Sequence, residues 1–77
     1  MLYQYNDLRI AVGPHVEDRI AERGGALPDV LDRVIKARDL PEARQGRPLA
    51  LTRGPVWPVV EFRPGARAVV ATVLAPG

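Results

Sequence analysis

One stretch of this sequence combines residue types that can act together on a phosphate group. His15, Arg19 and Arg23 follow one another at steps of four, and residues at this spacing lie on one side of an α-helix. Histidine can transfer a proton near neutral pH, and arginine binds phosphate through two parallel hydrogen bonds. The spacing therefore predicts a set of side chains that could cleave RNA without a metal, with one proton-transfer group and two phosphate-binding groups.

The same stretch also fits an ordinary solvated helix. Asp18 and Glu22 are interspersed with the two arginines, as is typical of a helix face in water. His15, in the first turn of the predicted helix, could simply cap the helix or form a local hydrogen bond. Spacing alone leaves both interpretations open.

Prolines and glycines mark the elements that must position these residues. Pro14 and Pro28 stand at predicted helix starts, and Gly24-Gly25 follows the first helix. Val16 and Ile20 lie four apart and form the apolar side of that helix, so the histidine and arginines are expected beside it, at the margin between helix and sheet. Helices are predicted over 14–24 and 28–38, and strands over about 2–12, 48–53, 56–62 and 67–74.

Details of the predicted strands complete the fold. Tyr3 and Tyr5, before Asn6-Asp7, indicate an earlier hairpin strand. Pro58 favours an edge or a bulge, and residues 67–74, apolar on both faces, predict a central strand. Strict alternation would place Val70 and Val73 on opposite faces. We expect an α+β domain, with an N-terminal strand or hairpin and two helices packed on one face of a three- to four-stranded antiparallel sheet.

The composition limits the chemistry. The chain has 77 residues, no cysteine and one histidine, which predicts a single compact domain over 1–77 without a disulfide, thiolate site or multi-histidine metal centre. No metal or other cofactor is expected. Apolar runs are too short to span a bilayer, and the polar N-terminal residues do not resemble a secretory signal. We expect a cytoplasmic protein with no membrane partner.

Charge is unevenly distributed along the chain. Residues 1–42 hold six basic and eight acidic residues, whereas residues 43–77 hold five arginines and one carboxylate, Glu61. A basic half suits a polyanion such as RNA. Arg44, Arg47 and Arg53 are candidate RNA contacts, and Glu61 is a candidate base partner for His15.

The pattern His15-x3-Arg19-x3-Arg23-Gly24, followed by a short helix, a glycine-containing break and a final Val69-Val70-Ala71-Thr72-Val73 strand, resembles a family of small bacterial and phage domains. That family is similar to the barnase–EndoU–colicin–RelE class of ribonuclease toxins, and the resemblance covers about residues 8–74. It implies metal-independent RNA cleavage, with His15 as general acid or base and Arg19 and Arg23 on the phosphate. It also implies that Thr72 contributes a hydroxyl, and it does not fix the role of Glu61.

Two functions follow as expectations. The first is a small ribonuclease-like toxin that cleaves RNA by His-assisted phosphoryl transfer and has an antitoxin as partner. The alternative is a non-enzymatic phage or mobile-element protein that binds and inhibits a host protein. Tyr3 and Tyr5 would suit addition of a strand from a partner, or contact within a homodimer.

Overall fold

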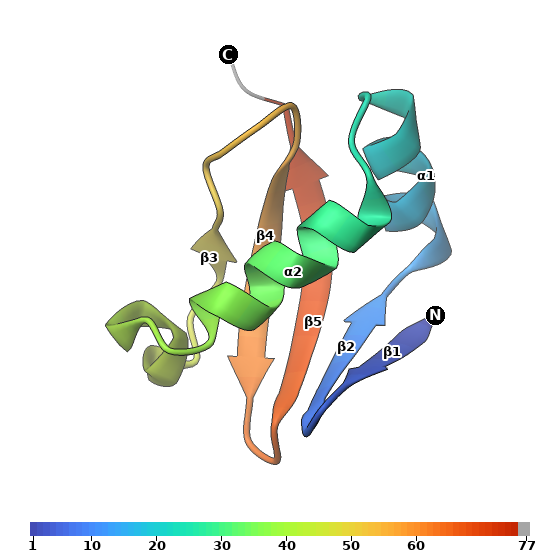
Figure 1. Cartoon of the computed structure of the whole chain (residues 1–77). Coiled ribbons are helices and arrows are strands. Elements are labelled where there is room, and N and C mark those ends of the chain that lie inside the picture. The colour runs from blue at the N-terminus through green and yellow to red at the C-terminus, as the bar shows by residue number, and fades with distance from the viewer. Residues whose placement is uncertain (76–77) are drawn as a thin grey trace.

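A single mixed sheet organises the molecule. The computed structural model describes residues 1–75, and its strands lie in the order β1-β2-β5-β4-β3. Figure 1 shows both α-helices on one side of the sheet, with α2 crossing in front of β4 and β5. We call the opposite side the helix-free face. The elements are β1 (Leu2–Tyr5), β2 (Leu8–Val12), α1 (Pro14–Glu22), α2 (Leu27–Ala37), the 3₁₀ helix η1 (Pro41–Gln45), β3 (Leu49–Ala50), β4 (Trp57–Arg63) and β5 (Arg67–Leu74).

The predicted α+β class, the N-terminal hairpin and the central position of the last strand are confirmed. The predicted sheet composition is wrong in two respects. There are five strands, since β1 and β2 join the other three, and the sheet is mixed because β2 pairs with β5 in parallel. The first hairpin therefore forms one half of the sheet and the three later strands form the other.

A bulge in β5 decides which of its side chains face the helices. Val59 pairs with Thr72 and Val60 pairs with Val70, so Ala71 is an extra residue without a partner on β4. Such an insertion shifts the alternation by one position. Val70 and Val73 are consequently both buried on the helix side, and the prediction that they lie on opposite faces is wrong. Pro58 was predicted to favour an edge or a bulge: β4 is not an edge strand, and the register shift lies beside Pro58, between Val59 and Val60, with its extra residue on β5.

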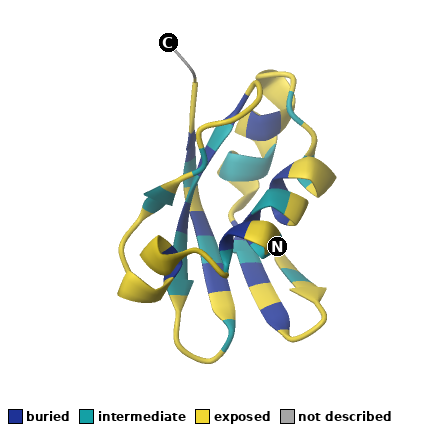
Figure 2. Ribbon diagram, turned by 60° about the vertical axis from the view of Figure 1, so that its left-hand side comes forward, coloured by how far each residue is buried: buried dark blue, intermediate teal, exposed yellow. Residues whose placement is uncertain are grey.

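The core lies between the two helices and the sheet. Val34 of α2 and Ile10 of β2 are completely buried, as the apolar side of α2 predicts. Ile20 of α1 packs in a second cluster with Val73 of β5. Figure 2 shows buried positions alternating with exposed ones along the strands, as a sheet covered on one face requires. The fully buried large side chains are Ile10, Ile20, Val12, Val30, Val34, Val56, Val60, Val70, Val73 and Pro58.

Two glycines end α1 and permit the close approach of β4. Gly24 has a φ of 77°, a left-handed conformation that glycine adopts without steric cost. A Cβ atom on Gly25 would lie 2.8 Å from the Cγ2 atom of Val56 and 3.2 Å from that of Ile20. The predicted glycine stop is therefore also a packing requirement, because only hydrogen fits between the end of α1 and Val56.

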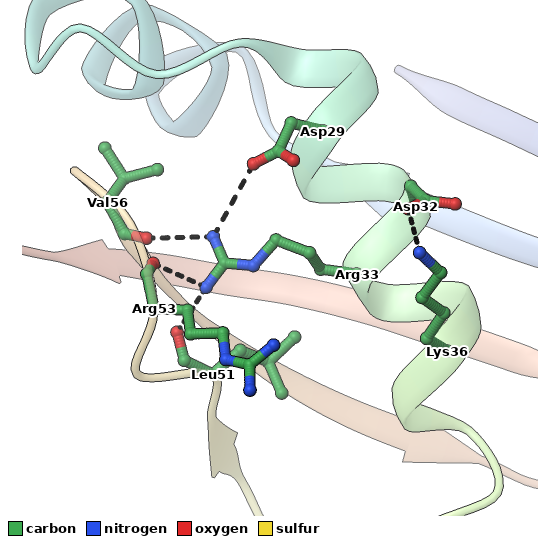
Figure 3. A network of polar contacts seen from close by, with 7 residues as sticks. All are labelled: Asp29, Asp32, Arg33, Lys36, Leu51, Arg53 and Val56. Atoms are coloured by element: carbon green, nitrogen blue, oxygen red, sulfur yellow. Dashed lines mark hydrogen bonds and ion pairs between the residues drawn. The ribbon is translucent and has the colours of Figure 1, made fainter.

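Arg33 ties α2 to the loop between β3 and β4. Its guanidinium donates hydrogen bonds to the carbonyl oxygens of Val56 at 3.1 Å, Leu51 at 2.8 Å and Arg53 at 2.6 Å. Asp29 lies 3.8 Å from the same guanidinium (Figure 3). The Arg33 side chain is only 14% exposed, so these bonds hold a loop that has little regular structure of its own.

A second polar contact joins α2 to the first hairpin. Arg38, just after α2, donates to both carboxylate oxygens of Asp7 at 2.8 and 3.1 Å. This bidentate geometry is the favourable one for an arginine–carboxylate pair. It lowers the pKa of Asp7 and raises the pKa of Arg38. The hairpin turn is thereby fixed to the end of α2.

Candidate functional site

Helix α1 carries the His15, Arg19 and Arg23 stripe, and contacts on its other sides fix its position. Ile20 is 1% exposed in the core. The hydroxyl of Tyr3, on β1, donates to Oε1 of Glu17 at 2.5 Å, and this hydrogen bond raises the pKa of Tyr3. The helix is thus held from the core and from the edge strand, which leaves the stripe turned to solvent.

The three stripe residues are all exposed, and one of them is bound to the sheet. The backbone N–H of Arg23 donates to the Arg19 carbonyl at 3.1 Å, so Arg23 keeps helical register although it lies just past α1. Its Nη1 atom donates to the carbonyl of Val73 at 2.8 Å. The stripe therefore begins near the end of β2 and ends against the end of β5, and only Arg23 is hydrogen-bonded at the predicted helix–sheet margin.

The acidic residues of α1 do not neutralise the arginines of the stripe. Glu17 is engaged by Tyr3. In the described part of the chain, neither Asp18 nor Glu22 forms an ion pair or hydrogen bond with Arg19 or Arg23. The guanidinium of Arg19 and part of that of Arg23 are therefore available to an anion.

Thr72 and Glu61 lie on the helix-free face and not with the stripe. Thr72 precedes Val73, whose side chain packs against α1, and it pairs with Val59. Glu61 follows Val60, which is completely buried under the helices. Its carboxylate lies 3.6 Å from the guanidinium of Arg63. The structure does not bring these two residues together with His15. The alternation of side chains along β4 and β5 places both on the face of the sheet opposite α1.

The predicted RNA contacts form a separate group. Arg44 lies in η1, Arg47 follows it, and Arg53 lies in the loop before β4; all three are exposed. In Figure 1, α1 and η1 lie at opposite ends of α2. Arg53 also contributes its backbone carbonyl to the bond network of Arg33. The two groups are thus set apart by the length of α2.

Two further properties of the described residues bear on function. Among residues 1–75, no three histidine or acidic side chains are grouped as a metal site would require. Within the same residues, neither helix has the length and apolar character needed to cross a membrane.

Comparison of the chain with protein-family models, with curated proteins and with solved structures found no match. We therefore infer function from the residues of this chain and their arrangement.

Sequence reasoning missed the contacts that position α1. The sequence predicts that Tyr3 suits a strand added by a partner or a dimer contact, and it gives no sign that the Tyr3 hydroxyl donates to Glu17 of α1. The bond from Arg23 to the Val73 carbonyl was likewise not predicted. Neither contact has a local signal, because both join residues that are distant in sequence. The one sequence signal is the alternation of Tyr3 with the polar residue Gln4, which indicates that these two side chains lie on opposite faces of the strand.

Proposed function

We propose that this domain is a small, metal-independent ribonuclease-like toxin and that the α1 stripe is its reactive site. The observation that carries the proposal is the exposed His15 beside two arginines, Arg19 and Arg23, that no carboxylate of residues 1–75 neutralises. Cβ atoms four residues apart on a helix are about 5–6 Å from each other. One phosphate can therefore contact both a guanidinium and the imidazole.

The proposed reaction needs one group that accepts a proton and positively charged groups that bind the phosphate. The neutral imidazole of His15 takes the proton of a ribose 2′-hydroxyl while the 2′-oxygen bonds to phosphorus. The bond from phosphorus to the 5′-oxygen breaks, and water protonates this leaving oxygen, since Glu61 and Thr72 lie across the sheet. Arg19 and Arg23 stabilise the charge that develops on the phosphate oxygens. The products are a 2′,3′-cyclic phosphate and a 5′-hydroxyl.

The test compares purified variants on a labelled RNA in the presence of EDTA. We expect cleavage by the wild-type chain and a 10²–10⁴-fold loss with His15→Ala, the usual effect of removing one proton-transfer group. Arg19→Ala should also lose activity, whereas Lys36→Ala, which removes an exposed positive charge from α2, is the control. An RNA with 2′-deoxyribose at the cleaved position should resist. Equal cleavage by wild type and His15→Ala would overturn the proposal.

A second function is favoured by the exposed edge strand β1. This strand ends the sheet, and its Leu2 and Tyr5 are 63% and 38% exposed. An open edge can accept a strand from another protein, as the inhibition of a host protein or a contact with an antitoxin would require. Toxicity in cells that persists in His15→Ala and disappears in Gln4→Pro, where the proline blocks the edge of β1, would favour this binding function.

A further inference from the structure

Three arginines form a row across the helix-free face of the sheet. Arg9 of β2 is the register partner of Arg67 of β5, and Arg67 is the register partner of Arg63 of β4. Adjacent strands lie about 4.8 Å apart. All three residues are exposed, and each follows or precedes a residue that faces the helices. We call Arg9, Arg63 and Arg67 the arginine row.

The arginine row is electrostatically unfavourable within the folded chain. Like charges directly opposite each other on a sheet are destabilising. Glu61, 3.6 Å from Arg63, is the carboxylate that offsets them, which leaves two positive charges in excess among these four residues. Arg67 is held by a hydrogen bond from its Nε atom to the Pro64 carbonyl at 3.3 Å. An arrangement that costs stability in isolation can be compensated by an anionic ligand.

The surface beside the row is hollowed and apolar. A depression of about 280 Å³ lies at this end of the sheet, lined by Leu2, Arg9, Ala11, Arg63, Arg67, Ala68 and Val69. Guanidinium groups on its border can form bidentate bonds with phosphate oxygens. Their planes and the apolar floor can also support unpaired bases. The combination suits a single strand of nucleic acid better than an acidic peptide, which would use the charges but not the floor.

We infer that the arginine row binds the phosphate backbone of single-stranded RNA. The site is distinct from the α1 stripe, because the row lies on the helix-free face and at the start of β5, whereas Arg23 binds at the end of β5. Binding here does not depend on cleavage by His15. A chain that binds RNA without cutting it would contradict the proposed function and leave this inference intact.

The test measures the binding of a 5′-labelled single-stranded RNA by fluorescence anisotropy, in the His15→Ala background so that the RNA stays intact. We expect Arg9→Gln and Arg67→Gln each to raise Kd roughly tenfold, the effect of losing one charge-assisted contact. Each should also reduce the slope of log K against log salt by about 0.7, the value for one phosphate contact on a single strand. Lys36→Gln, at an exposed position of α2 outside both groups of arginines, is the control with the same change of charge. Arg44→Gln and Arg47→Gln test the group that the sequence predicts to contact RNA.

Glu61→Gln gives a test that misfolding cannot imitate. Removal of the carboxylate that offsets the row should tighten RNA binding several-fold, because Arg63 is then free to contact phosphate. Far-UV circular dichroism of each variant checks that it is folded. Binding that is unchanged in the row variants but lost in the Arg44 and Arg47 variants would overturn the inference. So would row-dependent capture of a poly-glutamate peptide by a chain with no affinity for RNA.

Discussion

The network around Arg33 allows a quantitative prediction of stability. Its guanidinium bonds to three backbone carbonyls, and its side chain is 14% exposed. A hydrogen bond of this kind contributes about 0.5–1.5 kcal/mol net. The partner Asp29 is 61% exposed, so its ion pair adds little. Replacing Arg33 with alanine should therefore lower the free energy of unfolding by about 2–4 kcal/mol.

A loss of that size is a large part of the total. At about 0.05–0.15 kcal/mol per residue, a chain of 77 residues has roughly 4–12 kcal/mol of stability. Urea denaturation followed by circular dichroism measures the change, and the m-value shows whether the variant still unfolds in two states. Thermal unfolding should show a fall in Tm of at least about 8 °C.

Two variants isolate the cause. Arg53→Ala removes an exposed side chain but keeps the carbonyl that Arg33 binds, and it should change stability by no more than about 0.5 kcal/mol. Arg33→Lys keeps the charge but lacks the planar fork that spans several carbonyls, so it should fall between wild type and Arg33→Ala. If Arg33→Ala were as stable as Arg53→Ala, the network would not hold the loop. Full stability of Arg33→Lys would show that charge, and not the fork, is what matters.

Three further outcomes are expected. Gly25→Ala should lose about 1–3 kcal/mol in urea denaturation, because its Cβ would press on Val56; a neutral effect would mean that the end of α1 can shift freely. Val34→Ala should lose about 1–3 kcal/mol by transfer and cavity terms, since Val34 is completely buried, and an unchanged urea midpoint would contradict the core as described. Arg38 holds the pKa of Asp7 below its ordinary value of 3.8, so this pair stabilises the fold above that value and ceases to do so as pH falls through the lowered pKa. Asp7→Asn should therefore unfold at lower urea than wild type at pH 7, and the difference should shrink as pH falls below 3.8 and Asp7 becomes protonated. A difference that stays constant as pH falls would assign it to some other cause.

The helices and their ends could be predicted because their signals act on the local backbone. Pro14 and Pro28 mark helix starts, and Gly24 adopts the left-handed conformation at the end of α1. The pairing of β2 with β5 had no such signal, because a parallel pair joins strands that are distant in sequence. The bulge at Ala71 also had no signal in the sequence. Residues 68–71 are apolar throughout, so their hydrophobicity does not report which side chain is the extra one.

The α1 stripe was predictable for the same local reason, since helical spacing alone aligns His15, Arg19 and Arg23. The placement of Glu61 and Thr72 depends on the face that each strand turns to the helices, which follows from register and from the bulge. Prediction of the arginine row would have required both the face of each strand and the pairing of the strands. Alternation in β2 set Arg9 apart from Leu8 and Ile10, but only the pairing of β2 with β5 places it beside Arg67.

The parallel pairing of β2 with β5 also sets the order in which the domain can be assembled during synthesis. The middle of the sheet joins residues 9–12 to residues 67–70, so the first hairpin and both helices leave the ribosome before their central partner exists. Leu8, Ile10 and Val12, all buried in the finished fold, are then open to water and to other chains. Contacts of such long sequence separation slow folding, and exposed apolar strands favour aggregation during the delay. Nascent chains arrested before residue 67 should accordingly be sensitive to protease and bound by chaperones, and they should become resistant once β5 has emerged.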